Sequence, residues 1–128
     1  YLTDHILILN ENVSIQAGSS PDYGGNVENI NPEQKLAAAV SSCFMMTFLA
    51  LAAKMKWPVK SYKDEAISYL GKNNEGRMFV NKIELNPQII FDDGFNISDD
   101  EMHRMKERSH KYCFIANSLS KEVEIKIN

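Results

Sequence analysis

The first third of the chain contains two short runs of apolar residues separated by polar ones. Residues 4–9 (DHILIL) and 12–17 (NVSIQA) have the composition of β-strands, and Asn10 and Glu11 lie between them. Two such runs joined by turn-favouring residues predict a β-hairpin. Residues 18–31 are polar and include three glycines, so they predict a loop.

The longest apolar run is the eighteen uncharged residues 36–53, LAAAVSSCFMMTFLALAA. It follows Asn31 and Pro32, which are typical of the residue that caps a helix and of the first helical position. Trp57-Pro58 comes after it, and proline disfavours helix at the residue before it. The pattern therefore predicts one long helix over residues 32–56.

This run also has to be considered as a membrane span. Its length is at the lower limit, since a span needs about 17–25 apolar residues. However, alanine, serine and threonine dilute its hydrophobicity, and a helix that is apolar on every side is equally typical of a protein core. We therefore expect a buried core helix and no membrane association.

The second half of the chain has β character again. Residues 59–70 and 77–91 are predicted to form two antiparallel strands joined by the turn 71–76. Asp92-Asp93-Gly94 then turns the chain.

A helix is expected after Ser98, because Glu101 stands at the position that completes a capping box. A short helix is predicted over residues 114–119, and the alternating residues 122–127 predict a closing strand. The expected fold is a single α+β domain covering residues 1–128.

The long helix also predicts an obligate homodimer. A single sheet covers only one side of a helix, and this helix is apolar on all sides. A second subunit is the natural cover for the remaining apolar surface.

Composition narrows the functional classes. The chain has 128 residues and a net charge of -3, which gives no indication of a nucleic-acid or anionic-membrane partner. The two cysteines are too few for a secreted disulfide scaffold, and the three histidines are not spaced as zinc ligands. We expect a cytoplasmic protein without a metal.

The two cysteines are the candidates for chemistry. Cys43 lies in the middle of the apolar helix, and Cys113 follows the charged helix. Spacing alone leaves two interpretations open: buried structural cysteines, or a redox pair in which one thiolate is oxidised and the other thiol forms a disulfide with it. The helix dipole acts only on the first turn, so Cys43 would need another source of a lowered pKa, such as a cation held by a carboxylate.

Glu33 is the candidate carboxylate. An acid in the first turn of a helix is also a routine stabiliser of that helix. Ten residues of helix separate Glu33 from Cys43 by about 15 Å along the axis. The two side chains could therefore meet only across a dimer whose long helices run antiparallel.

Taken together, these segments resemble a known family. Residues 31–36 (NPEQKL) and 42–44 (SCF) resemble the NPEQL…A(A/S)CF signature of the OsmC/Ohr peroxidases. Residues 109–113 (SHKYC), 117–119 (NSL) and 123–125 (VEI) resemble the second-cysteine segment and closing strand of that family.

The resemblance implies an OsmC-like intertwined homodimer, with long central apolar helices wrapped by antiparallel sheets. It implies Cys43 as the peroxidatic cysteine, Cys113 as the resolving cysteine and Glu33 as the acid that orients a catalytic arginine. The implied substrates are organic or lipid hydroperoxides, the implied reductant is a dithiol or a lipoyl-bearing protein, and no cofactor is needed. The alternative is a non-peroxidase member that binds a small apolar molecule at the dimer interface.

Two positions depart from the family pattern. Phe114 follows the second cysteine, where close homologues commonly have proline. No arginine precedes Arg77, although the family's catalytic arginine lies in the N-terminal strands. That arginine is therefore upstream of Tyr1, replaced by one of Arg77, Arg104 and Arg108, or absent.

Overall fold

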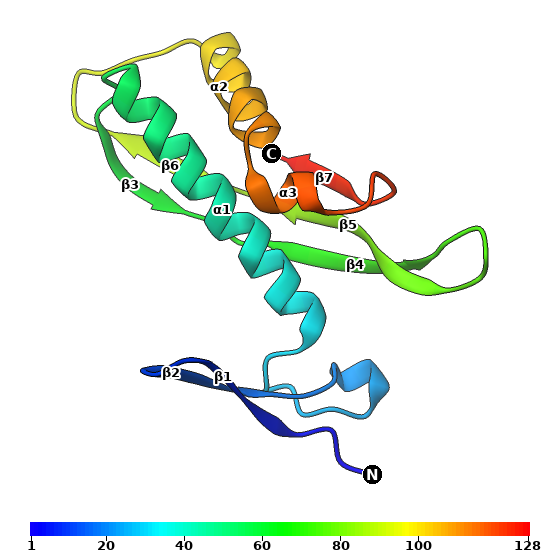
Figure 1. Cartoon of the computed structure of the whole chain (residues 1–128). Coiled ribbons are helices and arrows are strands. Elements are labelled where there is room, and N and C mark those ends of the chain that lie inside the picture. Colours follow the sequence, from blue (N-terminus) through cyan, green and yellow to red (C-terminus); the bar gives the residue numbers. More distant parts are fainter. The chain divides into compact units, whose positions relative to one another are not determined.

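The computed structural model describes residues 1–128, which form two compact units: Tyr1–Leu36 and Ala37–Asn128. Figure 1 shows the order of the elements along the chain. The architecture is mixed α+β with one long helix. The two units are described separately below.

The first unit is built on a hairpin, as the sequence predicted. Strand β1 (His5–Asn10) pairs antiparallel with β2 (Val13–Ala17). The loop after it contains one turn of 3-10 helix, Pro21–Tyr23, and returns to the hairpin through a bridge between Ala17 and Ile30.

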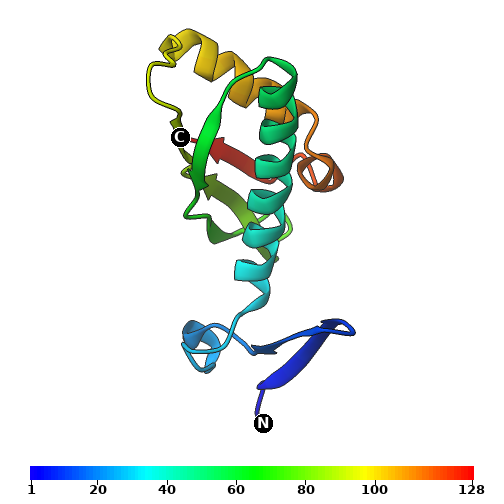
Figure 2. The same cartoon turned by 90° about the vertical axis from the view of Figure 1, so that its left-hand side faces the viewer.

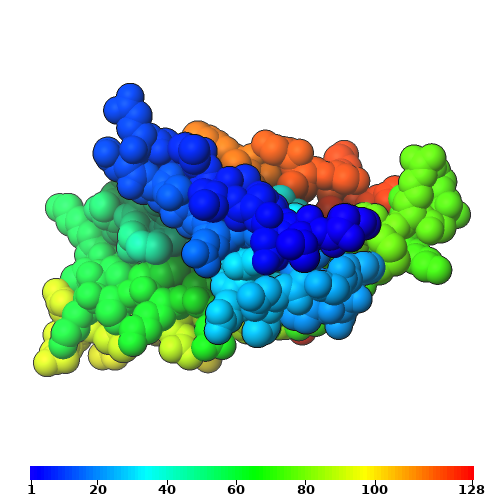
Figure 3. Space-filling model, turned by 90° about the horizontal axis from the view of Figure 1, so that it is seen from below, coloured from blue at the N-terminus to red at the C-terminus, as the bar shows by residue number.

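The hairpin exposes much of its apolar surface. Its most exposed apolar side chains are Ile6, Ile8, Leu9 and Val13, and Ile8 is 79% accessible. The space-filling view draws this hairpin in dark blue and the loop after it in lighter blue (Figure 3). Because an isolated two-stranded hairpin is at best marginally stable in water, this surface favours further packing.

Helix α1 (Pro32–Lys54) begins where the sequence predicted and ends two residues earlier than predicted. Asn31 and Gln34 cap its start reciprocally: each backbone N–H donates to the other's side-chain oxygen, at 2.9 and 2.8 Å. The helix ends because Lys56 adopts a left-handed conformation with φ of 59°. The Trp57 N–H then donates to the carbonyl of Ala52 at 2.8 Å.

α1 is long and apolar enough to cross a membrane by length and composition, which is also true of core helices in soluble proteins. In the second unit it serves as a core helix. Phe44 and Phe48 are fully buried, and the Phe48 ring lies 6.0 Å from the ring of Tyr62 on the neighbouring strand.

The predicted antiparallel pairing of residues 59–70 with residues 77–91 is present, but each of the two long strands is broken in two. The four strands are β3 (Val59–Lys63), β4 (Ile67–Lys72), β5 (Met78–Leu85) and β6 (Gln88–Phe91). β4 pairs with β5, whereas β3 pairs with β6 in a separate sheet.

The break has a local cause. Pro87 lacks the N–H that a continuous ladder would require. The preceding Asn86 N–H donates to the carboxylate of Asp64 at 2.6 Å, and the Asn86 side chain donates to the carbonyl of Glu65 at 2.9 Å. Side-chain hydrogen bonds thus replace strand pairing between the two sheets.

The closing strand β7 (Glu124–Ile127) runs parallel to β5. The sheet β4–β5–β7 is therefore mixed, whereas the β1–β2, β3–β6 and β4–β5 pairs are antiparallel, as expected. Parallel strands need a long connection, and the two helices between β6 and β7 provide it.

These helices are α2 (Asp99–Lys111) and α3 (Phe114–Ser118). The predicted capping box is present, since Ser98 and Glu101 cap each other. In the two ribbon views α1 crosses one face of the strands, with α2 and α3 beside it (Figures 1 and 2). The core between these elements includes the fully buried side chains Val40, Phe44, Phe48, Ile83, Leu85 and Cys113.

Candidate functional site

The two cysteines, seventy positions apart in the sequence, meet in the second unit. Cys43 lies in the middle of α1 and is 9% exposed, whereas Cys113 precedes α3 and is fully buried. Both are free thiols. The two side chains lie close enough for hydrogen bonding between them to shift the pKa of each.

The turn between α2 and α3 positions Cys113. The Cys113 N–H donates to the carbonyl of His110 at 3.2 Å, which closes the end of α2. The side chain of Asn117 reaches back and donates to the carbonyl of Lys111 at 2.9 Å. These bonds fix the angle between the helices, so that the cysteine at the turn faces α1.

Several donors surround the sulfur of Cys43. Burial by itself raises the pKa of Cys43, but hydrogen bonds to the thiolate outweigh that effect and lower the pKa overall. The donors are the backbone N–H of Ile115, the thiol of Cys113, the backbone N–H of Phe114 and the hydroxyl of Thr47. All of these donors are neutral, and the cation expected from the sequence is not among them.

The pKa of Cys113 moves in the opposite direction. Burial raises it, and so do the hydrogen bond to Cys43 and the repulsion from a Cys43 thiolate. The backbone N–H groups of Ala116 and Ile115 oppose this shift without cancelling it. Cys43 is therefore the first of the two thiols to ionise.

The hydroxyl of Thr47 has two acceptors within reach. In the structure it donates to the carbonyl of Cys43, one turn earlier on α1, at 2.8 Å. It also lies close enough to the Cys43 sulfur to lower the pKa of that thiol. Because a hydroxyl carries one proton, it serves only one acceptor at a time.

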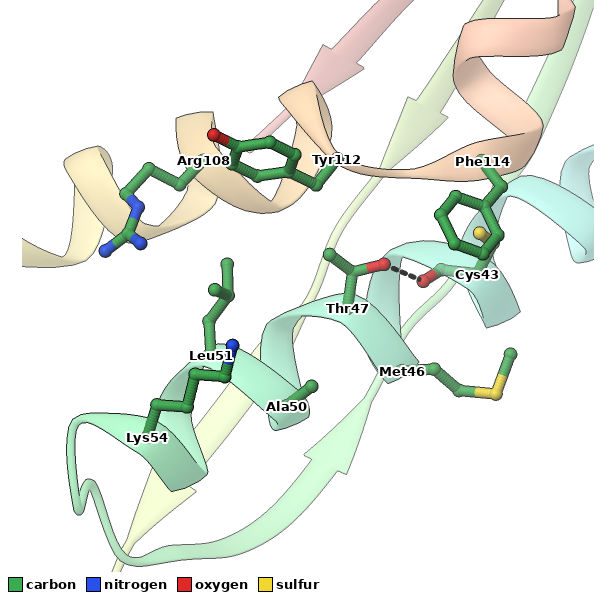
Figure 4. Close-up of a pocket in the computed structure, with 9 residues that line it drawn as sticks. All are labelled: Cys43, Met46, Thr47, Ala50, Leu51, Lys54, Arg108, Tyr112 and Phe114. Carbon is green, nitrogen blue, oxygen red and sulfur yellow. Dashed lines mark hydrogen bonds between the residues drawn. The ribbon is translucent and has the colours of Figure 1, made fainter.

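A cavity of about 660 Å³ opens beside Cys43. Figure 4 shows its lining residues, which come from α1, α2 and the start of α3. The α1 residues recur at helical spacing and so form one face of the helix. The cavity is lined by Cys43, Met46, Thr47, Ala50, Leu51, Lys54, Arg108, Tyr112 and Phe114.

The two ends of the cavity differ in chemistry. Cys43 and Phe114 lie at one end, and the charged groups of Lys54 and Arg108 lie at the other (Figure 4). The wall between them is mostly apolar. Phe114, at the position where the family commonly has proline, is 81% exposed and lies beside the sulfur of Cys43 (Figure 4).

Of the three arginines that the sequence offered, only Arg108 lines the cavity. Arg77 lies on an exposed turn, with its guanidinium 3.7 Å from the carboxylate of Glu75. Arg104 is exposed on α2 and is not part of the lining. The guanidinium of Arg108 points to the end remote from Cys43, so it is not positioned to activate that sulfur (Figure 4).

Glu33 is not among the lining residues. It lies in the first turn of α1, is half-buried and belongs to the first compact unit. The structure thus brings together two of the three residues that the sequence singled out.

Sequence reasoning missed Thr47 and Lys54. Both follow Cys43 at helical spacing, four and eleven residues later, which would have placed them on the same face of α1. Tyr112, which follows α2, was also missed as part of the cavity lining. No group of three or more His, Cys, Asp or Glu side chains is arranged to hold a metal ion.

A protein-family comparison matches residues 24–128 to the family described as OsmC-like protein. No protein with curated annotation matches the sequence.

Solved structures have the same fold. An OsmC-like protein of unknown function from Vibrio cholerae is 36% identical, with a TM-score of 0.88 over 100% of this chain and 86% of that one. An organic hydroperoxide resistance protein from Elizabethkingia anophelis is 19% identical, with a TM-score of 0.78 over 99% and 93%. Another from Legionella pneumophila is 17% identical, with a TM-score of 0.71 over 98% and 94%. The present chain belongs to the OsmC-like protein family.

Proposed function

We propose that this protein is a thiol peroxidase that reduces organic hydroperoxides with Cys43 and Cys113. The observation that carries the proposal is that Cys43 lines an open, largely apolar cavity and has Cys113 close enough to shift its pKa. Structural core cysteines need neither a lowered pKa nor access to a cavity. A thiolate nucleophile needs both.

In the first step the Cys43 thiolate attacks the terminal oxygen of the hydroperoxide. The O–O bond breaks, Cys43 becomes a sulfenic acid, and the leaving alkoxide takes a proton from water to give an alcohol. In the second step the Cys113 sulfur attacks the Cys43 sulfur. The disulfide forms, and the departing hydroxide combines with the Cys113 proton to give water.

The pKa pattern suits this order. A Cys43 thiolate raises the pKa of Cys113 by repulsion and by accepting its hydrogen bond. Once Cys43 is a neutral sulfenic acid, that repulsion is gone and Cys113 ionises more readily. The resolving thiol is therefore held protonated until it is needed.

Names in the family support the same chemistry. The Elizabethkingia and Legionella proteins are organic hydroperoxide resistance proteins, although the more similar Vibrio protein has no known function. We further propose that a dithiol or a lipoyl-bearing protein reduces the disulfide, that no cofactor takes part, and that the protein works in the cytoplasm, where thiols stay reduced.

We also propose a homodimer. α1 carries an exposed stripe of small and apolar residues, Ala39, Ser42, Met46 and Ala50, on the side away from its buried phenylalanines. The exposed apolar hairpin β1–β2 adds a second surface that a partner would cover. In an antiparallel pair of α1 helices, Glu33 of one copy would approach Cys43 of the other.

The test is thiol titration with intact mass after one equivalent of cumene hydroperoxide, and again after dithiothreitol. We expect loss of both thiols, a mass decrease of two hydrogens, and full reversal by the dithiol. Two intact thiols after this treatment would reject the peroxidase.

A second candidate function is binding of a small apolar ligand without turnover. The apolar wall of the cavity supports it independently of the cysteines. Tight binding of cumyl alcohol by protein that leaves cumene hydroperoxide unreacted would favour this alternative.

A further inference from the structure

The cavity beside Cys43 has a feature that a simple hydroperoxide such as cumene hydroperoxide does not use. Lys54 and Arg108 close its far end with two positive charges (Figure 4). We propose that these two residues bind an anionic group, a carboxylate or a phosphate, on a long-chain substrate. This inference rests on the proposed function and specifies its substrate class.

The geometry suits an elongated molecule. Cys43 and Lys54 are eleven residues apart on α1, so their backbones are about 16 Å apart along the axis. Met46, Ala50 and Leu51 line the space between them. A molecule whose anion lies at the cations would extend an apolar chain along this wall and present a hydroperoxide to the sulfur.

The two cations are available for a ligand. Neither Lys54 nor Arg108 forms an ion pair within the chain. The acidic neighbour of Arg108 on α2, Glu107, is engaged with His103 at 2.9 Å. A basic residue in the last turn of a helix is ordinarily a stabiliser of that helix, and both residues occupy such positions. Stabilising the end of its own helix does not require either side chain to line the cavity. Both side chains nevertheless line the same cavity, although they come from two different helices.

The charges also complement the rest of the site. A guanidinium binds carboxylate or phosphate through paired hydrogen bonds, and a lysine ammonium adds a point charge. The apolar walls lower the local dielectric and so strengthen both interactions. A neutral hydroperoxide gains no binding affinity from this end of the cavity. Lys54 and Arg108 would therefore determine which substrate binds, and would take no part in the reaction at Cys43.

The test uses unreactive ligands, so that it does not depend on peroxidase activity. Binding of decanoate, decyl phosphate and decanol is measured by calorimetry on the reduced full chain. The variants are Lys54→Gln and Arg108→Gln. Their controls are Lys60→Gln and Arg104→Gln, which remove the same charges at exposed positions outside the cavity.

We expect at least one of the two anions to bind about tenfold or more tightly than decanol. Each cavity variant should reduce that preference about tenfold, Arg108→Lys should retain part of it, and the controls should leave it unchanged. Preference for decanoate would indicate a free fatty-acid hydroperoxide, and preference for decyl phosphate would indicate a phospholipid fragment.

Three results would each overturn this inference. They are equal affinity for decanol and both anions, no binding of either anion, and an equal loss of anion affinity in the cavity variants and the control variants. Failure of the proposed function is distinguishable from these outcomes. It would appear as unreacted cumene hydroperoxide, whatever the variants do to the binding of decanoate.

Discussion

The side chains of Cys43 and Cys113 lie close enough to shift the pKa of each other in opposite directions, although Cys43 belongs to α1 and Cys113 precedes α3. The pair is asymmetric, because hydrogen bonding between the two side chains lowers the pKa of Cys43 and raises that of Cys113.

The first prediction concerns the pH dependence of Cys43 reactivity. Because the pKa of Cys43 is lowered, its alkylation by iodoacetamide should remain fast below the pKa of a free cysteine, about 8.5, and slow only at lower pH. Cys113→Ala removes a donor and should move the midpoint to higher pH. Cys113→Ser keeps an O–H donor and should move it less. Equal midpoints in the two variants would mean that the Cys113 hydrogen bond does not tune Cys43.

The second prediction separates the roles of the two cysteines. Cys43→Ser should abolish consumption of cumene hydroperoxide because the nucleophile is lost. Cys113→Ser should complete one turnover and then stop as sulfenic acid or a more oxidised form, because no thiol resolves it. Stopped-flow peroxide consumption and intact mass measure both outcomes. Equal multiple-turnover rates in wild type and Cys43→Ser would contradict the assignment.

The third prediction concerns Glu33. If the site is completed by a second copy, Glu33→Gln should slow peroxide consumption, because the carboxylate that would orient a catalytic cation is lost. Asp22→Asn, a charge removal in an exposed short helix of the same unit, is the control. An unchanged rate in Glu33→Gln would remove this residue from the site.

The fourth prediction concerns oligomeric state. Size-exclusion chromatography with light scattering should give a dimer at low micromolar concentration. Ala39→Glu places a charge on the exposed stripe of α1 and should shift the protein toward monomer, because a buried unpaired charge is costly. Lys60→Glu, at an exposed position on β3, should leave the dimer intact. A wild-type monomer would reject the dimer and the shared role of Glu33 with it.

The fifth prediction tests the core beneath the site. Phe48→Ala removes a fully buried ring and should lower the free energy of unfolding by about 3–5 kcal/mol. Phe114→Ala makes the same change at a ring that is 81% exposed and should stay within about 0.5 kcal/mol. Urea denaturation of the two variants at equal protein concentration provides the comparison. Similar losses would mean that Phe114 packs against something in solution, such as a second copy.

The sequence determined the elements whose signals are local. Both main helices begin where their caps predicted, because Asn31 with Gln34 and Ser98 with Glu101 satisfy backbone groups only a few residues away. The β1–β2 hairpin followed from alternation and a short turn. The family resemblance, now shown, rested on contiguous motifs around the two cysteines.

The tertiary structure decided everything that depends on contacts between distant segments. The strands over 59–91 split because Asp64 takes the N–H of Asn86 twenty-two residues later, and β7 joined β5 in parallel because two helices intervene. Packing of α2 against α1 selected Arg108 rather than Arg77 or Arg104 for the cavity and brought Lys54 to the same end. Periodicity places a residue on a face of its own helix, but only packing determines which other element that face meets.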